Sequence, residues 1–226
     1  SDIGFSGDDL DVAAFNAFVA GSEGYCMTLY DQSGNGNNLV QNNIAQQPLL
    51  VVSGSGGKPV LRCSPLRNLK LAKQFPAPYS VIYAAKQTGP TRQRMLQATG
   101  NNWFLGWWGG YKDVAYFNSW VASPTTFADN GTYIYSATGN GSSSSVYRNG
   151  DLLGSSNATA PPVGVGLNGG LAGNEGSDGD FMDVLVFNTV LTTTQRNLVE
   201  GTISSYYDIV LLMQVSAKPF EIFVVL

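Results

Sequence analysis

The chain has 226 residues, 43% of them apolar, which is enough for one sizeable buried core without a division into two domains. Its formal net charge is −4 at pH 7, and its lysines and arginines are scattered rather than clustered. Because neutralising phosphates requires grouped cations, nucleic acid is excluded as a partner. Histidine is absent, which disfavours serine triads and zinc hydrolysis and leaves carboxylate chemistry of the glycosidase type as the enzyme option.

The composition also predicts the fold class. The chain contains 27 glycines and many Ser, Thr and Asn residues, whereas only 12% of its residues are charged. Helices favour Ala, Glu, Lys and Leu, so this composition fits short strands joined by turns. We therefore expect an all-β domain.

The first predicted element is a short helix over about residues 10–20, capped by Asp8 or Asp9 and ended by Gly21. Its buried face is expected to hold Leu10, Ala13, Ala14, Ala17 and Phe18. A last helix is predicted over about residues 193–206, with Thr192 or Thr193 as its cap and Leu198, Ile203 and Tyr206 on its buried side.

Strands are predicted between these helices wherever apolar and β-branched runs lie between Gly, Asn and Pro. The runs are residues 25–30, 49–52, 60–62, 79–86, 94–97, 103–108, 114–120, 131–138, 144–148, 163–167 and 180–187. Their even spacing favours a two-sheet antiparallel sandwich of the jelly-roll type.

We expect the domain to span residues 1–208, followed by an apolar tail over residues 209–226. Gln214, Ser216, Lys218 and Pro219 interrupt this tail, so it falls short of the roughly 20 apolar residues that a membrane helix requires. The tail could complete the sandwich as a strand pair or be a linker. A third possibility is self-association, in which the tail adds as a strand to a neighbouring subunit.

A loop of small and amide residues runs from Tyr30 to Leu39. Within it Asp31, Ser33 and Asn35 alternate ahead of a glycine, which matches the first half of a calcium-binding loop. The second half does not match, because Asn42 stands where a bidentate glutamate would be expected. Asn-Gly and Ser-Gly pairs are also ordinary turn chemistry. We interpret the loop first as a structural turn, with a calcium site at these three residues as the alternative.

The same loop resembles the Tyr-Asp-Gln-Ser-Gly-Asn-Gly-Asn signature of concanavalin A-like domains, which include LamG-type modules and the catalytic domain of the arabinofuranosidase B family. Residues 179–188 and the segment up to Gly201 look like the closing strand and short helix of LamG-type domains, and residues 146–150 look like a strand near the middle of the sandwich. The resemblance covers roughly residues 3–208 and implies a concanavalin A-like jelly roll.

The arabinofuranosidase resemblance implies two catalytic carboxylates across a sugar bond. Carboxylates near the matching segments are Asp31, Glu175, Asp178, Asp180 and Asp183. Gly169-Gly170 with Asn174-Glu175 is only loosely similar to that family's Gly-Gly-Asp-Asn segment, and the cysteine-rich portion before it is missing. Asp180 and Asp183 are an odd number of residues apart, so regular alternation would point them to opposite faces of a strand. We therefore predict no catalytic pair.

Four further positions are given structural roles. Asp183 is expected to face solvent or to pair with Arg196, and Glu200 is expected to make a helix-surface or capping contact. Cys26 and Cys63, the two cysteines of the chain, could form a disulfide or remain buried free thiols.

The best candidate for a binding site is a cluster of aromatic residues that includes all four tryptophans: Trp103, Trp107, Trp108, Tyr111, Tyr116, Phe117 and Trp120. Sugar rings stack on aromatic planes, while neighbouring Asn and Asp side chains bind their hydroxyls. Strand alternation sends about half of such side chains into the core, and we expect Phe104 and either Trp120 or Phe117 there. The predicted ligand-binding residues are Trp107, Trp108, Tyr111, Asn102 and Asp113.

These patterns predict a non-catalytic carbohydrate-binding or structural and adhesive surface module that needs no cofactor, unless the Asp31 loop holds calcium. Its expected partner is a glycan or a cell-surface polysaccharide, met at an extracellular, cell or virion surface. Two alternatives remain open. The chain could be a glycoside hydrolase related to the arabinofuranosidases, or an assembly subunit of a virion or extracellular filament.

Overall fold

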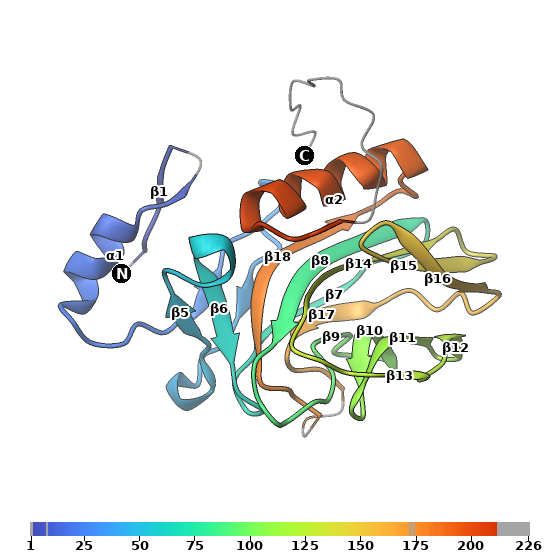
Figure 1. The fold of residues 1–226 in the computed structure, drawn as a ribbon, viewed down its shortest axis with the longest axis horizontal. Helices are drawn as coiled ribbons and strands as arrows, with labels where there is room; N and C mark the ends of the chain where they lie inside the picture. The colour runs from blue at the N-terminus through green and yellow to red at the C-terminus, as the bar shows by residue number, and fades with distance from the viewer. Residues whose placement is uncertain (1, 8, 172, 174, 212–226) are drawn as a thin grey trace.

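A computed structural model describes residues 2–7, 9–171, 173 and 175–211. Figure 1 shows two stacked sheets, with helix α2 (Thr193–Tyr207) lying across the outer face of one of them. Every strand pair in the two sheets is antiparallel. The predicted all-β, two-sheet antiparallel sandwich is confirmed.

The sheet beneath α2, here called the helix-side sheet, has the strand order β16-β15-β14-β8-β18-β6-β5 in the described part of the chain. Its strands are β5 (Leu49–Val51), β6 (Val60–Cys63), β8 (Tyr79–Gln87), β14 (Thr132–Gly139), β15 (Ser144–Arg148), β16 (Asp151–Ser156) and β18 (Gly179–Phe187). The long strands β8 and β18 lie side by side at its centre, so segments far apart in the sequence form the middle of this layer.

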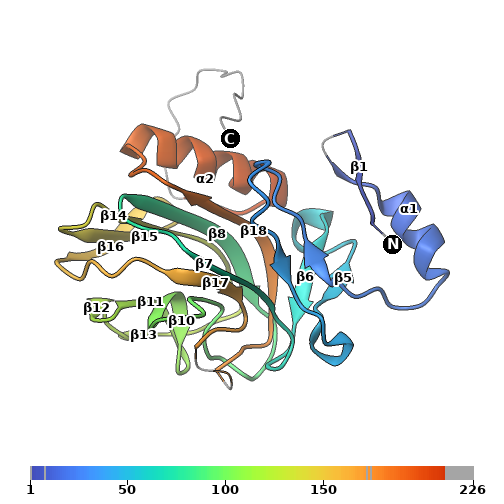
Figure 2. The same ribbon diagram turned by 180° about the vertical axis from the view of Figure 1, so that it is seen from behind.

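The second sheet, here called the open sheet, has the order β12-β11-β10-β9-β17-β7-β4-β3, with β13 pairing with β11. Its strands are β3 (Thr28–Leu29), β4 (Leu39–Val40), β7 (Leu69–Gln74), β9 (Leu96–Gln97), β10 (Trp103–Trp108), β11 (Tyr111–Phe117), β12 (Trp120–Ala122), β13 (Thr126–Phe127) and β17 (Val163–Leu167). Among the described residues, its outer face carries no helix comparable to α2 (Figure 2).

Each predicted strand overlaps an observed one, but four differences affect the open sheet. Residues 114–120 form two strands, because Asn118 adopts a positive φ of 57° and turns the chain between β11 and β12. Strands β4, β7 and β13 of this sheet were not predicted, and neither was β16 of the helix-side sheet. In β7, Lys70 and Lys73 obscure the alternation of Leu69 with Leu71, whose side chains belong to the core.

The core between the sheets is built from large aromatic side chains. Trp103 stacks on Phe117 with ring centroids 4.7 Å apart, and Trp107 packs edge-on against Tyr135 at 4.8 Å. These four side chains are at most 1% exposed. Burial of an aromatic side chain removes a large apolar area from water, so this cluster is a main source of cohesion between the two layers.

Helix α2 begins at a capping box formed by Thr192 and Gln195, as the sequence predicted for Thr192. Its inward face carries Ile203 and Tyr207, which pack with Ile82 and Ala84 of β8. The expected burial of Leu198 is wrong, since that side chain is 50% exposed.

Glu200 lies on the inward face of α2 and is fully buried, so the predicted surface or capping role is also wrong. Its Oε1 accepts hydrogen bonds from Arg196 Nη1 at 2.8 Å and from Ser136 Oγ at 2.6 Å. The Arg196 guanidinium lies 3.7 Å from the ring centroid of Tyr147. The contacts with Ser136 and Tyr147 tie the helix to strands β14 and β15. The buried charges of Arg196 and Glu200 depend on each other for solvation.

A β-bulge in β18 corrects the expectation that Asp180 and Asp183 face opposite ways. The register shifts between Phe181 and Val184, which both pack on the core between the sheets. The extra residue brings Asp183 to the α2 side, where it hydrogen-bonds to Tyr207, and the expected partner Arg196 pairs with Glu200 instead.

The first helix, α1 (Val12–Val19), is capped by the Asp11 side chain rather than by Asp8 or Asp9. Phe15 is its one buried residue, whereas Phe18 is 58% exposed, so the predicted buried face is wrong. With the small hairpin of β1 (Phe5–Ser6) and β2 (Asp9–Leu10), α1 stands beside the sandwich near β5 (Figures 1 and 2). Short 3-10 turns at Ile44–Gln46 and Ser55–Gly57 complete the described elements.

The remaining structural expectations concern the cysteines and the tail. Cys26 and Cys63 are free thiols. Ile209 is buried under α2, whereas the expectations for residues 212–226 lie outside the described residues. No helix among the described residues is both long and apolar enough to cross a membrane.

Replacing Glu200 with Leu is expected to lower the free energy of unfolding by about 3–5 kcal/mol, because Arg196 is left buried without its counter-charge. The measurement is urea denaturation followed by circular dichroism. The matched control is the double variant Arg196→Met/Glu200→Leu, which removes both charges and should recover much of that loss. A double variant no more stable than the single one would contradict this account.

Burial raises the pKa of Asp183 above its ordinary value of 3.8. Because its pKa is higher in the folded than in the unfolded state, the folded protein loses stability as the pH rises from about 3.8 through the raised value. Asp183→Asn cannot ionise and still accepts a hydrogen bond from Tyr207. Its stability relative to the original protein should therefore grow across that pH window and then level off. Urea denaturation at a series of pH values measures this difference, and a constant difference would show that burial of the charge is unimportant.

Candidate functional site

Six aromatic side chains lie on the outer face of the open sheet, where strands β10 to β13 meet. Directly paired residues of antiparallel strands point to the same face, and the pairs here are Phe104 with Tyr116, Tyr116 with Trp120, Trp108 with Tyr111, and Tyr111 with Phe127. The six residues, here called the aromatic strip, are Phe104, Trp108, Tyr111, Tyr116, Trp120 and Phe127.

The strip is a stacked layer whose outer rings reach solvent. Phe104 is only 2% exposed and forms its base, with Tyr116 stacked on it at a centroid distance of 5.6 Å. Trp120 meets Trp108 at 5.6 Å and is 36% exposed. At the far end, Phe127 stacks on Tyr111 at 5.0 Å and is 74% exposed. The result is an aromatic surface held rigid from below.

Polar side chains border the strip at Phe104. The Arg94 guanidinium lies 4.3 Å from the Phe104 ring centroid, and its Nη1 donates a hydrogen bond of 2.9 Å to Asn102 Oδ1. Arg94 Nε also forms an ion pair with Glu175 at 2.5 Å. Burial lowers the pKa of Arg94, and the Glu175 carboxylate opposes that shift. The contacts with Arg94 hold Asn102 and Glu175 in place beside the aromatic rings.

Gln97 adds an unusual buried amide to this edge of the strip. It pairs directly with Phe104 across strands β9 and β10 and is 1% exposed, yet neither amide atom has a hydrogen-bond partner in the described part of the structure. A Cβ atom at Gly170 would lie 2.4 Å from the Gln97 side chain, so glycine is required for this close approach. The amide therefore retains hydrogen-bonding capacity next to the strip.

The structure brings three of the five predicted binding residues to this face: Trp108, Tyr111 and Asn102. The expectation that Trp107 is exposed is wrong, because this side chain is in phase with Trp103 and Leu105 and is completely buried in the core. Counting the alternation strictly from Trp103 would have placed it inside.

Asp113 does not belong to the strip. It is the extra residue of a bulge, with a positive φ of 64°, and its carboxylate pairs with Arg148 and accepts a hydrogen bond of 2.8 Å from Tyr135 Oη. The predicted alternative that Phe117 lies inside is correct, whereas Trp120 lies outside. Strict alternation from Phe104 and recognition of the Asn118 turn would have identified Tyr116 and Trp120 as part of the strip.

The Asp31 loop uses its carboxylate to close a turn. Oδ1 accepts the backbone N–H of Ser33 at 2.9 Å, and Oδ2 accepts that of Asn37 at 2.8 Å. Hydrogen bonding from Ser33, with a further contribution from Asn37, lowers the pKa of Asp31. Ser33 Oγ in turn accepts a hydrogen bond from the Asn35 amide at 2.9 Å. These contacts match the structural interpretation of the loop, and calcium binding there stays a prediction.

The other carboxylates named from the sequence have separate partners. Asp180 forms a bidentate pair with Arg62 at 2.7 and 2.8 Å, and Asp178 Oδ2 accepts the Thr91 backbone N–H at 2.9 Å. Glu175 forms an ion pair with Arg94, and Asp183 lies beneath α2, where it hydrogen-bonds to Tyr207. The hydrogen bonds and ion pairs of the described residues thus place Glu175 alone among these acids beside the aromatic strip.

No protein-family model matches this sequence, and no curated protein matches it. Among solved structures, the chain is similar to an arabinofuranosidase complexed with arabinofuranosyl-α-1,2-xylobiose, with a TM-score of 0.67, 14% sequence identity and coverage of 88% of this chain and 54% of that one. It is also similar to a GH54 α-L-arabinofuranosidase soaked with a cyclic sulfate inhibitor, at a TM-score of 0.61, 14% identity and the same coverages of 88% and 54%.

A third similar structure is the binding domain of Paraclostridial Mosquitocidal Protein 1, with a TM-score of 0.57, 14% identity and coverage of 88% of this chain and 51% of that one. The chain therefore spans about half the length of each of these three structures. At this identity the likeness establishes a shared β-sandwich fold and nothing more specific.

Trp107→Ala is expected to lower the free energy of unfolding by about 3–5 kcal/mol, because it opens a cavity in the core. Trp108→Ala removes a half-buried ring from the outer face and should cost less than about 2 kcal/mol. Thermal and urea denaturation of the two variants compares them directly. Equal losses would contradict the inward and outward placement of these neighbours.

Proposed function

We propose that this chain is a non-catalytic carbohydrate-binding module and that the aromatic strip is its glycan-binding face. The observation that carries the proposal is the stacked, partly exposed layer of rings on the open sheet, anchored from below by the buried Phe104. Flat aromatic surfaces bind the C–H faces of sugar rings, and rings already held in place lose little entropy when a ligand binds.

The polar edge of the strip supports the same proposal. Arg94 offers guanidinium donors beside Phe104, while Asn102 and Glu175 are held within its reach. Sugar hydroxyls require such mixed partners, so this edge would select the orientation of a sugar stacked on the rings.

Two finer expectations belong to this proposal. The first is that the domain is of the LamG type within the concanavalin A-like group and acts at an extracellular, cell or virion surface, where polysaccharides are presented. The second is that calcium binding at Asp31, Ser33 and Asn35 supports the fold of the neighbouring loop rather than the sugar contact, because this loop leads into β4 and lies several strands away from β10 to β13 in the open sheet.

Trp120→Ala and Trp108→Ala are each expected to weaken glycan binding by about tenfold or more, because each removes a stacking surface. A glycan array identifies ligands, and titration calorimetry with the best of them measures the affinity. Phe18→Ala is the matched control, since it also removes a ring from the surface, but on α1.

Unchanged binding in both tryptophan variants would refute the assignment of the strip. Release of a reducing sugar by the purified protein would favour the glycoside hydrolase alternative. If no glycan binds and the tryptophan variants instead abolish self-association in sedimentation experiments, the strip is an assembly surface. Repeating the array with a chelator tests whether binding depends on calcium.

A further inference from the structure

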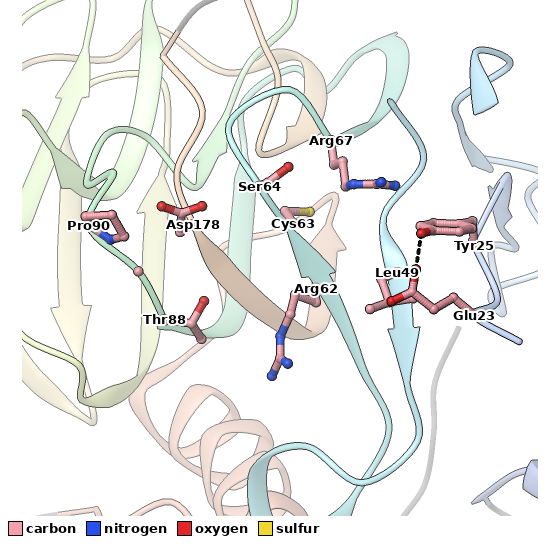
Figure 3. A pocket seen from close by; sticks show the side chains of 11 residues that line it. Glu23, Tyr25, Leu49, Arg62, Cys63, Ser64, Arg67, Thr88, Pro90 and Asp178 are labelled. Carbon is pink, nitrogen blue, oxygen red and sulfur yellow. Dashed lines mark hydrogen bonds between the residues drawn. The ribbon is translucent and has the colours of Figure 1, made fainter. Parts of the chain in front are cut away.

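A polar pocket lies on the opposite outer face of the molecule from the aromatic strip. A pocket of about 390 Å³ opens beside β6, lined by Glu23, Tyr25, Leu49, Arg62, Cys63, Ser64, Arg67, Thr88, Gly89, Pro90 and Asp178 (Figure 3). We propose that it binds one neutral saccharide unit, independently of the aromatic strip. Its volume lies at the small end of the range of small-molecule sites, roughly 300–1,000 Å³.

The pocket lies on the outer face of the helix-side sheet. Leu49 pairs directly with Arg62 across β5 and β6, and Arg62 pairs with Asp180 across β6 and β18. Arg62 is on the outer side of β6, because its neighbours Leu61 and Cys63 point into the core. The floor is therefore the outward surface of the sheet, and the strip lies on the outward surface of the other sheet.

One wall is held rigid by a chain of side-chain contacts. The Arg67 guanidinium lies 4.5 Å from the Tyr25 ring centroid and also donates to the backbone carbonyl of Gln47. The Tyr25 hydroxyl donates a hydrogen bond to Glu23, which raises the pKa of Tyr25 and keeps it a donor. Tyr25 and Glu23 are placed at this wall because Tyr25 forms a bridge with Leu49.

The opposite wall is fixed through the backbone. Asp178 Oδ2 accepts the Thr91 N–H at 2.9 Å, and its own backbone N–H donates to the Thr91 carbonyl. Gly89 makes this approach possible, since a Cβ atom there would lie 2.6 Å from Asp178 Cβ. Figure 3 shows Asp178, Thr88 and Pro90 on one side and Tyr25, Leu49 and Glu23 on the other, with β6 between them.

The chemistry of the lining favours a neutral polyol. Glu23 and Asp178 supply two acidic groups, and Arg62 and Arg67 supply two basic ones. Arg62 is already neutralised by its bidentate pair with Asp180. With Asp180 included, three acidic groups accompany two basic ones, so a phosphate or sulfate would find no surplus of positive charge. A sugar would find fixed acceptors and donors, with the hydroxyl groups of Ser64 and Thr88 between them.

Cys63 lines the pocket, but its thiol points into the core and does not suggest a covalent reaction. Cys63 is 3% exposed, and burial raises its pKa well above its ordinary value, so the reactive thiolate is suppressed. Reversible binding is therefore the chemistry that the wall supports. With one site on each outer face, the domain would hold two glycan branches at once, and avidity on a polymer would exceed the affinity of either site.

The test is an amide NMR titration of the full chain with the methyl glycosides of neutral hexoses and pentoses, with inorganic sulfate as a separate arm. We expect saturable shifts at Ser64, Thr88 and Gly89 with at least one glycoside. Ser64→Leu fills the pocket without removing a side-chain hydrogen bond of the described structure, and should abolish these shifts. Thr88→Leu, at an exposed position, is a second blocking variant should Ser64→Leu fold poorly.

Three outcomes would overturn the proposal. The first is an absence of saturable shifts at these amides with every glycoside. The second is saturation by sulfate but not by any glycoside, which would make the pocket an anion site. The third is loss of the same shifts in Trp120→Ala, which would trace them to the aromatic strip. Failure of the strip to bind glycans would leave the pocket shifts unaffected, so the two proposals fail separately.

Discussion

Strand β10 contributes side chains to both faces of the open sheet. The two-residue period of a strand sends Trp103, Leu105 and Trp107 into the core and leaves Phe104 and Trp108 on the outside. The inward tryptophans pack against Phe117, Tyr83 and Tyr135 and join the layers, while the outward residues begin the aromatic strip. Cohesion of the core and placement of the aromatic strip are therefore coupled, because the residues that fix the strand in the core also fix the direction of the exposed rings.

The two outer faces differ because only one of them is covered by α2. The buried pair of Arg196 and Glu200 and the apolar contacts of Ile203 hold this helix on the helix-side sheet. At the end of that sheet formed by β6 and β5, the outer face carries the polar pocket beside Arg62 and Tyr25. The open sheet keeps its rings accessible. One fold thus presents an aromatic surface on one side and a small polar pocket on the other.

Local irregularities explain where the sequence misled. Asp183 changes face because of the bulge in β18, and Asp113 is separated from the other predicted binding residues because of the bulge in β11. A one-residue insertion reverses every later side chain, and a single sequence gives little warning of it. Glu200 looked like a surface residue because an i,i+4 pair with Arg196 is common on exposed helix faces, whereas its second partner, Ser136, is far away in the chain and meets it only after the helix docks.

The sequence by itself determined the class of fold, the approximate strands and the turn at Asp31, because these depend on composition, alternation and residues that favour tight turns. It also located the aromatic segment and named Trp108, Tyr111 and Asn102 in it. The tertiary structure alone decided that Arg94, Glu175 and Gln97 border these rings and that Tyr25 and Asp178 face the same pocket. Such groupings join residues from distant strands, and the order of strands in a sheet follows from packing that no local pattern encodes.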